Sequence, residues 1–171
     1  MAPSATPEPA LRVGYGRDSH PFGPGYPLRL GGVAIERAPR LHGHSDGDVC
    51  LHAVAGALLA AASLGDLGTL FPADGRTKRG IDSGELLDDV VARLDAAGWR
   101  AATVSVTVVG SRPRLGAHLA AMRSAIAGRL DVEPETVSVQ ASTGNLSGDE
   151  GAGRAISATA VATVVSLGAR S

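Results

Sequence analysis

The sequence is poor in aromatic residues and contains a single cysteine, Cys50, among its 171 residues. Aromatic side chains make up 3% of the chain although 44% of its residues are hydrophobic, so its core must be built from small aliphatic side chains. Each small side chain buries little apolar area, and burial stabilises by about 25 cal/mol per Å². We therefore expect subunit contacts to supplement the core. A lone cysteine excludes an internal disulfide, so the fold does not depend on an oxidising compartment.

An excess of charge of either sign is also lacking, because 16 Lys and Arg residues face 17 Asp and Glu residues. This balance provides no positive field for a nucleic acid or an anionic membrane, and neither is expected as a partner. No apolar run approaches the roughly 18 residues of a membrane span, and the first residues lack the pattern of a secretory signal. We expect a cytoplasmic protein with a disordered tail at residues 1–9 and a single domain at 10–171.

The spacing of apolar and turn residues predicts alternating strands and helices. Strands are expected at 11–16, 28–35, 101–109, 136–141 and 155–166, and helices at 48–63, 82–97 and 114–130. Ser45 and Asp46 are expected to cap the first helix, and 65–80 to be irregular. The last strand carries no charge on either face, which indicates cover on both sides, with one cover too close for large side chains. This order predicts an α+β fold, a mixed sheet with helices packed on one face and an oligomer interface on the other.

Histidines are concentrated near the start of the chain, where four of the five lie within the first 52 residues. Asp18 and His20 fall on the same side of a strand because side chains alternate with a period of two. His52 lies on the first turns of the following helix. Together they could form an O/N/N site with an open fourth position, the pattern of catalytic zinc. An Asp-x-His pair alone is more often a satisfied loop contact, but that does not explain a histidine on an alanine-rich helix.

Three segments carry a resemblance to a known family: RVGYGRDSHPF at 12–22, GHSDGDVCLHA at 43–53 and LGDLGTLFP at 64–72. Shorter matches occur at 30–33, 82–83 and 112–114. The sequence resembles the 2-C-methyl-D-erythritol 2,4-cyclodiphosphate synthase family of the non-mevalonate isoprenoid pathway. The resemblance implies a homotrimer with active sites between neighbouring subunits and sheets facing the trimer axis. The substrate would be CDP-linked; its own phosphate attacks the β-phosphorus, CMP leaves and a cyclic diphosphate forms.

The resemblance also implies roles for individual residues. Asp18, His20 and His52 would bind zinc or another divalent transition metal, with magnesium or manganese as a candidate second ion at the diphosphate. His44 and Thr143 would be catalytic, His44 by binding a substrate phosphate and Thr143 by polarising the β-phosphate. Arg114 stands where the family usually has lysine, in a loop that would form the cytidine pocket of the adjacent subunit. The implied substrate-binding positions are Ser45, Asp66, Gly68, Phe71, Gly110, Arg112, Pro113, Arg114, Leu115, Gly116, Ser142 and Asn145.

The segment before the last strand departs from the family pattern. Asn145 occupies the position of an acidic residue that helps hold the second ion, and a neutral amide is a weaker ligand for a hard cation. Ala152 replaces a phosphate-facing arginine, and Thr159 replaces an acidic residue of the last strand. Asp149 or Glu150 could restore the lost ligand from a shifted position. From the sequence, these departures could either abolish the family's activity or redirect it to another substrate.

Two alternative functions remain beside the cyclising lyase. One is a divergent paralogue that acts on another cytidylylated alcohol phosphate, and the other is a non-catalytic trimeric nucleotide-binding protein. Some polar residues have simpler interpretations. His42 and His118 are expected to be surface histidines, and Lys78 and Arg79 to be solvated charges in preference to substrate contacts. Asp48 is either a helix cap or a functional acid.

Overall fold

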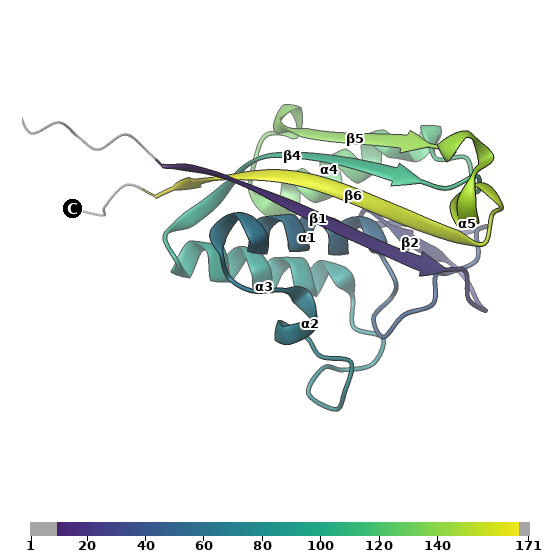
Figure 1. Cartoon of the computed structure of the whole chain (residues 1–171), viewed down its shortest axis with the longest axis horizontal. Coiled ribbons are helices and arrows are strands. Elements are labelled where there is room, and N and C mark those ends of the chain that lie inside the picture. Colours follow the sequence, from purple (N-terminus) through teal and green to yellow (C-terminus); the bar gives the residue numbers. More distant parts are fainter. Residues whose placement is uncertain (1–9, 168–171) are drawn as a thin grey trace, which may run out of the picture.

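A four-stranded sheet forms the centre of the molecule, in the order β1-β6-β4-β5 (Figure 1). The computed structural model describes residues 10–167, so the tail predicted at 1–9 lies outside the described residues. The strands are β1 (Leu11–Pro21), β4 (Trp99–Val109), β5 (Val137–Ser142) and β6 (Ala155–Ser166). Strand β6 runs antiparallel to β1 and β4, whereas β4 and β5 are parallel. The sheet is therefore mixed, as predicted.

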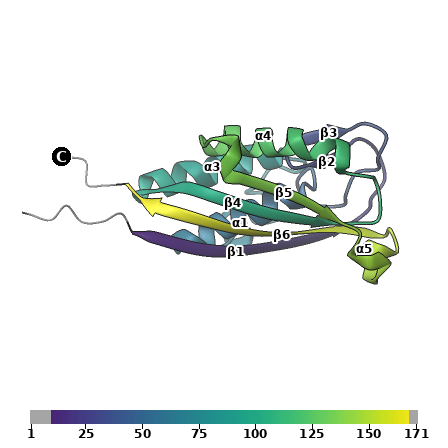
Figure 2. The same ribbon diagram turned by 90° about the horizontal axis from the view of Figure 1, so that it is seen from above.

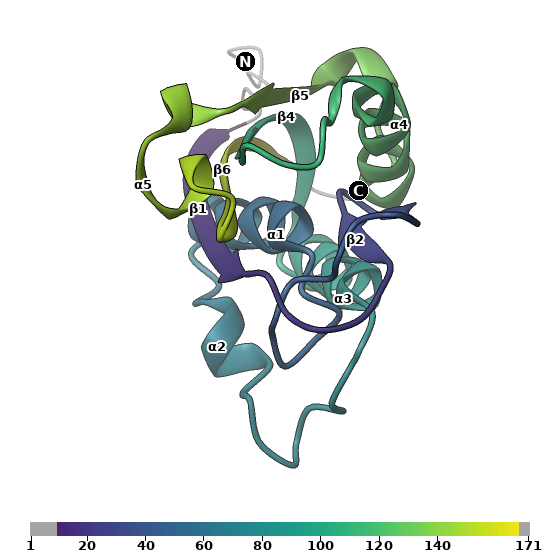
Figure 3. The same ribbon diagram turned by 90° about the vertical axis from the view of Figure 1, so that its right-hand side faces the viewer.

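Helices cover one face of this sheet, and the end-on view of Figure 3 places the three long helices on the same side. These are α1 (Val49–Ala62), α3 (Ser83–Ala96) and α4 (Leu119–Leu130). None of the three long helices lies on the opposite face (Figure 2). Shorter elements are β2 (Leu28–Leu30), β3 (Val33–Ile35), α2 (Leu67–Leu70), α5 (Gly148–Gly151) and the 3₁₀ turns Gly116–His118, Pro134–Thr136 and Gly144–Leu146. Between residues 10 and 167, no helix has the length and apolarity needed to cross a membrane.

Helix α1 lies unusually close to the sheet because its neighbours have small side chains. A Cβ atom at Gly14 would lie 2.0 Å from the carbonyl oxygen of Ala57, and one at Gly16 would lie 2.1 Å from that of Ala53. On β6 the buried face beneath the helices includes Ala158, Ala160 and Ala162. The close cover predicted for the last strand is thereby confirmed. The shortage of aromatic residues reflects a core with little space for rings.

Two predicted strands have different extents in the structure. Strand β1 continues beyond residue 16 through the polar cluster to Pro21, because the long strand β6 pairs with it along its full length. The single strand predicted at 28–35 is instead the hairpin β2-β3. Gly31 and Gly32 reverse the chain there with φ angles of 60° and 78°, a region that glycine enters without steric cost.

The helix boundaries differ in part from those predicted, and the interpretation of Asp48 as a helix cap is confirmed. Asp48, and not Ser45 or Asp46, caps α1 by accepting hydrogen bonds from the backbone N–H groups of Cys50 and Leu51. The same buried carboxylate accepts from the N–H groups at 31 and 32, so it also fixes the hairpin turn. The region 65–80 contains the short helix α2, and α4 begins five residues later than predicted because 114–118 form a loop and a 3₁₀ turn.

Candidate metal centre and active site

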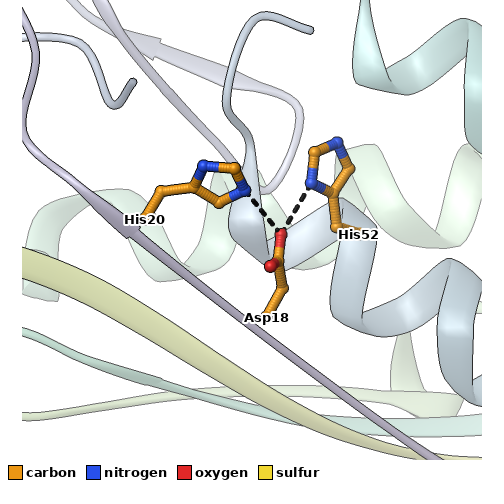
Figure 4. A group of neighbouring side chains, drawn as sticks. All are labelled: Asp18, His20 and His52. Carbon is orange, nitrogen blue, oxygen red and sulfur yellow. Dashed lines mark hydrogen bonds and ion pairs between the residues drawn. The ribbon is translucent and has the colours of Figure 1, made fainter. Parts of the chain in front are cut away.

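Asp18, His20 and His52 meet at the end of β1, and their candidate ligand atoms all lie within 4.8 Å of one another (Figure 4). The Oδ2 atom of Asp18 lies 3.0 Å from Nε2 of His20 and 2.7 Å from Nδ1 of His52. The first two residues come from β1 and the third from α1. The structure therefore confirms that the three residues predicted to bind a metal lie together.

The sequence of β1 explains this meeting. Because strand side chains alternate, Gly14, Gly16, Asp18 and His20 share the face that α1 covers. The two glycines let the helix approach the strand, and the two polar residues follow where the first turns of the helix present His52. Gly43 leaves room for the His20 ring, because a Cβ atom at this position would lie 3.1 Å from that ring.

Each histidine directs one ring nitrogen towards Asp18 and the other towards a partner elsewhere. A carbonyl oxygen can only accept a hydrogen bond, so Nδ1 of His20 donates to the carbonyl of His42, and Nε2 faces Asp18. Nε2 of His52 lies 2.9 Å from Ser83 Oγ, whose hydroxyl donates to Asp46, and Nδ1 faces Asp18. One carboxylate oxygen and two ring nitrogens thus converge, and the nitrogens would offer their lone pairs to a bound cation in place of their hydrogen bonds to Asp18.

The protonation equilibria reflect the same convergence. Burial of the Asp18 carboxylate favours its neutral form, but hydrogen bonds and charge interactions with His20 and His52 hold its pKa well below its usual range. The hydrogen bond with Asp18 in turn raises the pKa of His20, against the effect of burial. Asp18 is therefore ionised at neutral pH. A proton on His20 competes with a metal ion, so metal binding weakens as the pH falls.

A second layer of contacts orients His52, and sequence reasoning did not assign it. Asp46 accepts the hydroxyl of Ser83 and, at 3.2 Å, its backbone N–H. Ser83 accepts from His52, and Ser45 Oγ lies 3.1 Å from the same ring nitrogen. The sequence predicts only a helix cap for Asp46 and a place at the start of the helix 82–97 for Ser83. The sequence does contain a hint to Ser83, because residues 82–83 match the family, but this match alone does not indicate a role.

A cavity of about 550 Å³ opens beside the metal centre. Besides the three candidate ligands it is lined by the predicted site residues His44, Ser45, Asp66, Gly68 and Phe71. His44 is held at the wall by its Nε2–H, which donates to the carbonyl of Thr77 at 2.9 Å. Asp66 caps α2 by accepting from the N–H and hydroxyl of Thr69, and these hydrogen bonds lower the pKa of the carboxyl.

The remaining predicted residues do not line this cavity. The loop 110–116 and the residues Ser142, Thr143 and Asn145 follow the ends of β4 and β5, where Gly110 N–H donates to the carbonyl of Ser142 at 2.9 Å. They lie at the same end of the sheet as the metal centre, but β5 and β1 are its opposite edges. The loop 110–116 follows β4, two strand spacings of about 4.8 Å from β1, and its Arg112 guanidinium lies 4.6 Å from the centre of the Phe22 ring; Ser142, Thr143 and Asn145 follow β5, three spacings from β1. One chain therefore holds its predicted site residues in two separate groups.

The divergent segment 142–154 has an unusual backbone. Gly144, Asn145 and Leu146 have φ angles of 60°, 54° and 60°, in the left-handed region. Asparagine and aspartate tolerate this region better than longer side chains do. Asp149 is engaged in an exposed ion pair with Arg154, whose Nε lies 3.0 Å from the carboxylate. Its availability as a replacement metal ligand is accordingly reduced.

Comparisons with known proteins match this chain to one family along nearly its whole length. The model of the YgbB family matches residues 11–165. The 2-C-methyl-D-erythritol 2,4-cyclodiphosphate synthase of Gemmatimonas aurantiaca is 45% identical over 158 residues, which cover 92% of this chain and 95% of that protein. The bifunctional IspDF of Campylobacter jejuni superposes with a TM-score of 0.89 at 32% identity, covering 94% of this chain and 44% of that chain. A CDP-bound 2C-methyl-D-erythritol-2,4-cyclodiphosphate synthase has a TM-score of 0.79 at 33% identity, covering 90% of this chain and 99% of that chain.

Proposed function

The chain belongs to the YgbB family, whose matched relatives are named 2-C-methyl-D-erythritol 2,4-cyclodiphosphate synthases, and we propose that it is an enzyme of this kind. It would convert a CDP-methylerythritol 2-phosphate to the 2,4-cyclodiphosphate and release CMP, a step of isoprenoid-precursor synthesis. The observation that carries this proposal is the convergence of three candidate ligand atoms beside a cavity that also presents His44.

Asp18, His20 and His52 would hold a divalent metal ion, and an O/N/N donor set with an open position favours zinc. When bound, the ion would neutralise phosphate charge and polarise a phosphorus–oxygen bond. His52 is kept in the required tautomer by Ser83, and His20 by the carbonyl of His42. The protein thus orients both rings before any ligand arrives, which reduces the reorganisation that binding requires.

The reaction requires two anionic groups to be held in line. An oxygen of the substrate's own phosphate forms a bond to the β-phosphorus, the bond from that phosphorus to the bridging oxygen breaks, and CMP leaves with this oxygen. His44 would bind a substrate phosphate and stabilise the charge of the transition state, while Thr143 would polarise the β-phosphate. Asp66 and Gly68 would hold the ribose. Phe71 lies in the same cavity and would contact the substrate.

We further propose a homotrimer in which the loop 110–116 of one subunit completes the metal-side cavity of another. Two observations support it. The predicted site residues form two separate groups within one chain, and the sheet face opposite the long helices exposes apolar side chains. Leu11, Val13, Tyr15 and Val161 on this face are 62%, 63%, 59% and 44% exposed. Burying such a surface in a trimer would supply the apolar burial that a core of small residues lacks.

The proposed site also includes a second ion. A magnesium or manganese ion at the diphosphate would lie near Ser142, Thr143 and Asn145, where the amide is a weaker ligand than a carboxylate. The same substitution motivates the alternative of a paralogue with another cytidylylated substrate. The two functions differ in their products and not in the metal centre.

Phosphorus NMR of the purified protein with zinc, magnesium and CDP-methylerythritol 2-phosphate tests the proposal. Stoichiometric CMP and a cyclic diphosphate are expected. The absence of CMP at high protein concentration would refute the proposed activity. In that event, calorimetric binding of CDP without turnover would favour a nucleotide-binding protein, and turnover of another cytidylylated alcohol phosphate would favour a paralogue.

A further inference from the structure

His44 lines two smaller cavities in addition to the main one, with volumes of about 300 Å³ and about 360 Å³. Arg79 and His42 line both of them, and Arg40 lines the cavity of about 300 Å³. Neither cavity is lined by a carboxylate. The walls of these two cavities therefore carry only basic or uncharged groups, which suits an anion, whereas the carboxylates of Asp18 and Asp66 line the main cavity.

Both arginines lie on backbone that is fixed by hydrogen bonds. The loop that carries Arg79 is joined to His44 twice, since the His44 ring donates to the carbonyl of Thr77 at 2.9 Å and Gly80 N–H donates to the carbonyl of His44 at 2.7 Å. Arg40 N–H donates to the carbonyl of Gly25 at 2.9 Å, which joins the opposite loop. The walls of these cavities are thus formed before a ligand binds.

The two guanidinium groups also remain available. Within residues 10–167 neither Arg40 nor Arg79 has a carboxylate within ion-pair distance, whereas Arg76 on the same loop as Arg79 pairs with Asp74 at 2.7 Å. The Arg40 side chain makes a single long hydrogen bond among the described residues, 3.5 Å to the carbonyl of Ser45. Arginine binds phosphate through two parallel N–H groups, so an unpaired guanidinium at a cavity wall is suited to this anion.

We propose that Arg40 and Arg79 form a phosphate-binding subsite next to His44 that receives the phosphate monoester of the substrate. This inference rests on the proposed function, in which the substrate carries that monoester in addition to its diphosphate. A divalent ion bound to Asp18 leaves one net positive charge at the metal centre, and the proposed second ion would lie at the diphosphate, so the monoester needs a positive group of its own. The subsite supplies the missing positive charge on the side of His44 and orients the attacking phosphate.

Steady-state kinetics of CMP release in Arg79→Gln and Arg40→Gln/Arg79→Gln tests the subsite, with Lys78→Gln as the matched control. Lys78 is the exposed neighbour of Arg79 and lines none of the three cavities. We expect KM to rise about tenfold in the single variant and about a hundredfold in the double variant, as loss of charge-assisted hydrogen bonds predicts. Zinc content and the KM of the control should not change. Equal KM values in all variants would overturn the subsite.

Calorimetric titration of the zinc-loaded proteins with inorganic phosphate separates this inference from the proposed function, because it requires no turnover. Weaker phosphate binding in Arg79→Gln than in Lys78→Gln supports the subsite even if the wild type releases no CMP. Identical phosphate affinities in a protein that does release CMP would refute the subsite alone. An equal loss in the control would indicate a general surface-charge effect and would also refute it. Arg79 is exposed, so this variant remains decisive if changes at Arg40 impair folding.

Discussion

The metal centre and the segment 142–154 lie at the same end of one sheet, yet they are built differently. At the metal centre, two glycines of β1 bring α1 against the strand, and every ring nitrogen has a defined partner. The segment 142–154 consists of a 3₁₀ turn and one short helix, has three successive left-handed residues and carries its ion pair in solvent. Close packing fixes the metal centre. The segment 142–154 depends instead on residue types, such as glycine and asparagine, that tolerate left-handed φ angles.

This difference parallels the family resemblance. Asp18, His20 and His52, which match the family pattern, lie where packing and hydrogen bonds fix them, whereas the departures at Asn145 and Ala152 lie in the exposed segment. Its function can therefore change at a smaller cost in stability than a change at the metal centre would cause. The following variants test this contrast.

The largest effect is expected for His52→Ala, which removes one of the three converging candidate ligand atoms. Bound zinc, measured by elemental analysis after dialysis, should be lost, and CMP release should fall by more than about 100-fold. Thr143→Ala is the comparison from the other region and should retain full zinc content. Zinc content that is unchanged in His52→Ala would refute the ligand assignment.

Gly16→Ala should destabilise the fold more than a glycine change in the divergent segment. Its Cβ atom would lie 2.1 Å from a carbonyl oxygen of α1, so the helix must move, and we expect a loss of about 3 kcal/mol in the free energy of unfolding. Gly148→Ala, at a φ angle of 69°, should lose about 1 kcal/mol. Urea denaturation measures both. Similar losses in the two variants would contradict the proposed difference in packing.

Ser83→Ala should lower zinc affinity by about 10- to 100-fold while the fold persists, because His52 loses the acceptor that sets its tautomer. Ser124→Ala, an exposed serine on α4, is the matched control and should bind zinc like the wild type. Competition with a chromophoric chelator measures the affinity. Replacement of zinc by cobalt should show an altered visible spectrum in Ser83→Ala alone, and identical spectra would argue against a positioning role.

The smallest effect is expected at Asn145. Asn145→Asp should raise magnesium-dependent activity by at least about threefold, because a carboxylate is the stronger ligand for a hard cation. Asn145→Glu should gain less and should unfold more easily, since glutamate is disfavoured at a φ angle of 54°. Magnesium titrations at saturating zinc distinguish the variants. If neither gains activity, the segment does not hold a second ion in the way proposed.

Local pattern predicted most of the fold. Helices α1 and α3 and strands β4, β5 and β6 lie within two residues of their expected bounds, because each has regular apolar spacing and a clear cap or turn. The metal trio was also found from sequence, since Asp18 and His20 share a strand face. The extension of β1 was missed because a partner strand stabilises its polar end.

Contacts between distant segments were less accessible to prediction. Asp46 and Ser83 are separated by 37 residues, and the contact of Ser83 with His52 depends on how α1 and α3 are placed. The left-handed turn at Asn145 has no periodic signal. The distribution of the site between two groups likewise follows from the strand order, which a list of predicted strands does not specify.

The most direct test of the central claim, that a metal centre from one subunit meets a nucleotide loop from another, is complementation between two inactive variants. His52→Ala and Arg114→Ala/Thr143→Ala would be co-expressed with different affinity tags and purified through both. Any mixed trimer contains one intact site of three, so we predict about one third of the wild-type rate of CMP release. Mixed trimers as inactive as either parent, from a wild type that is active, would show that each site is built within one chain.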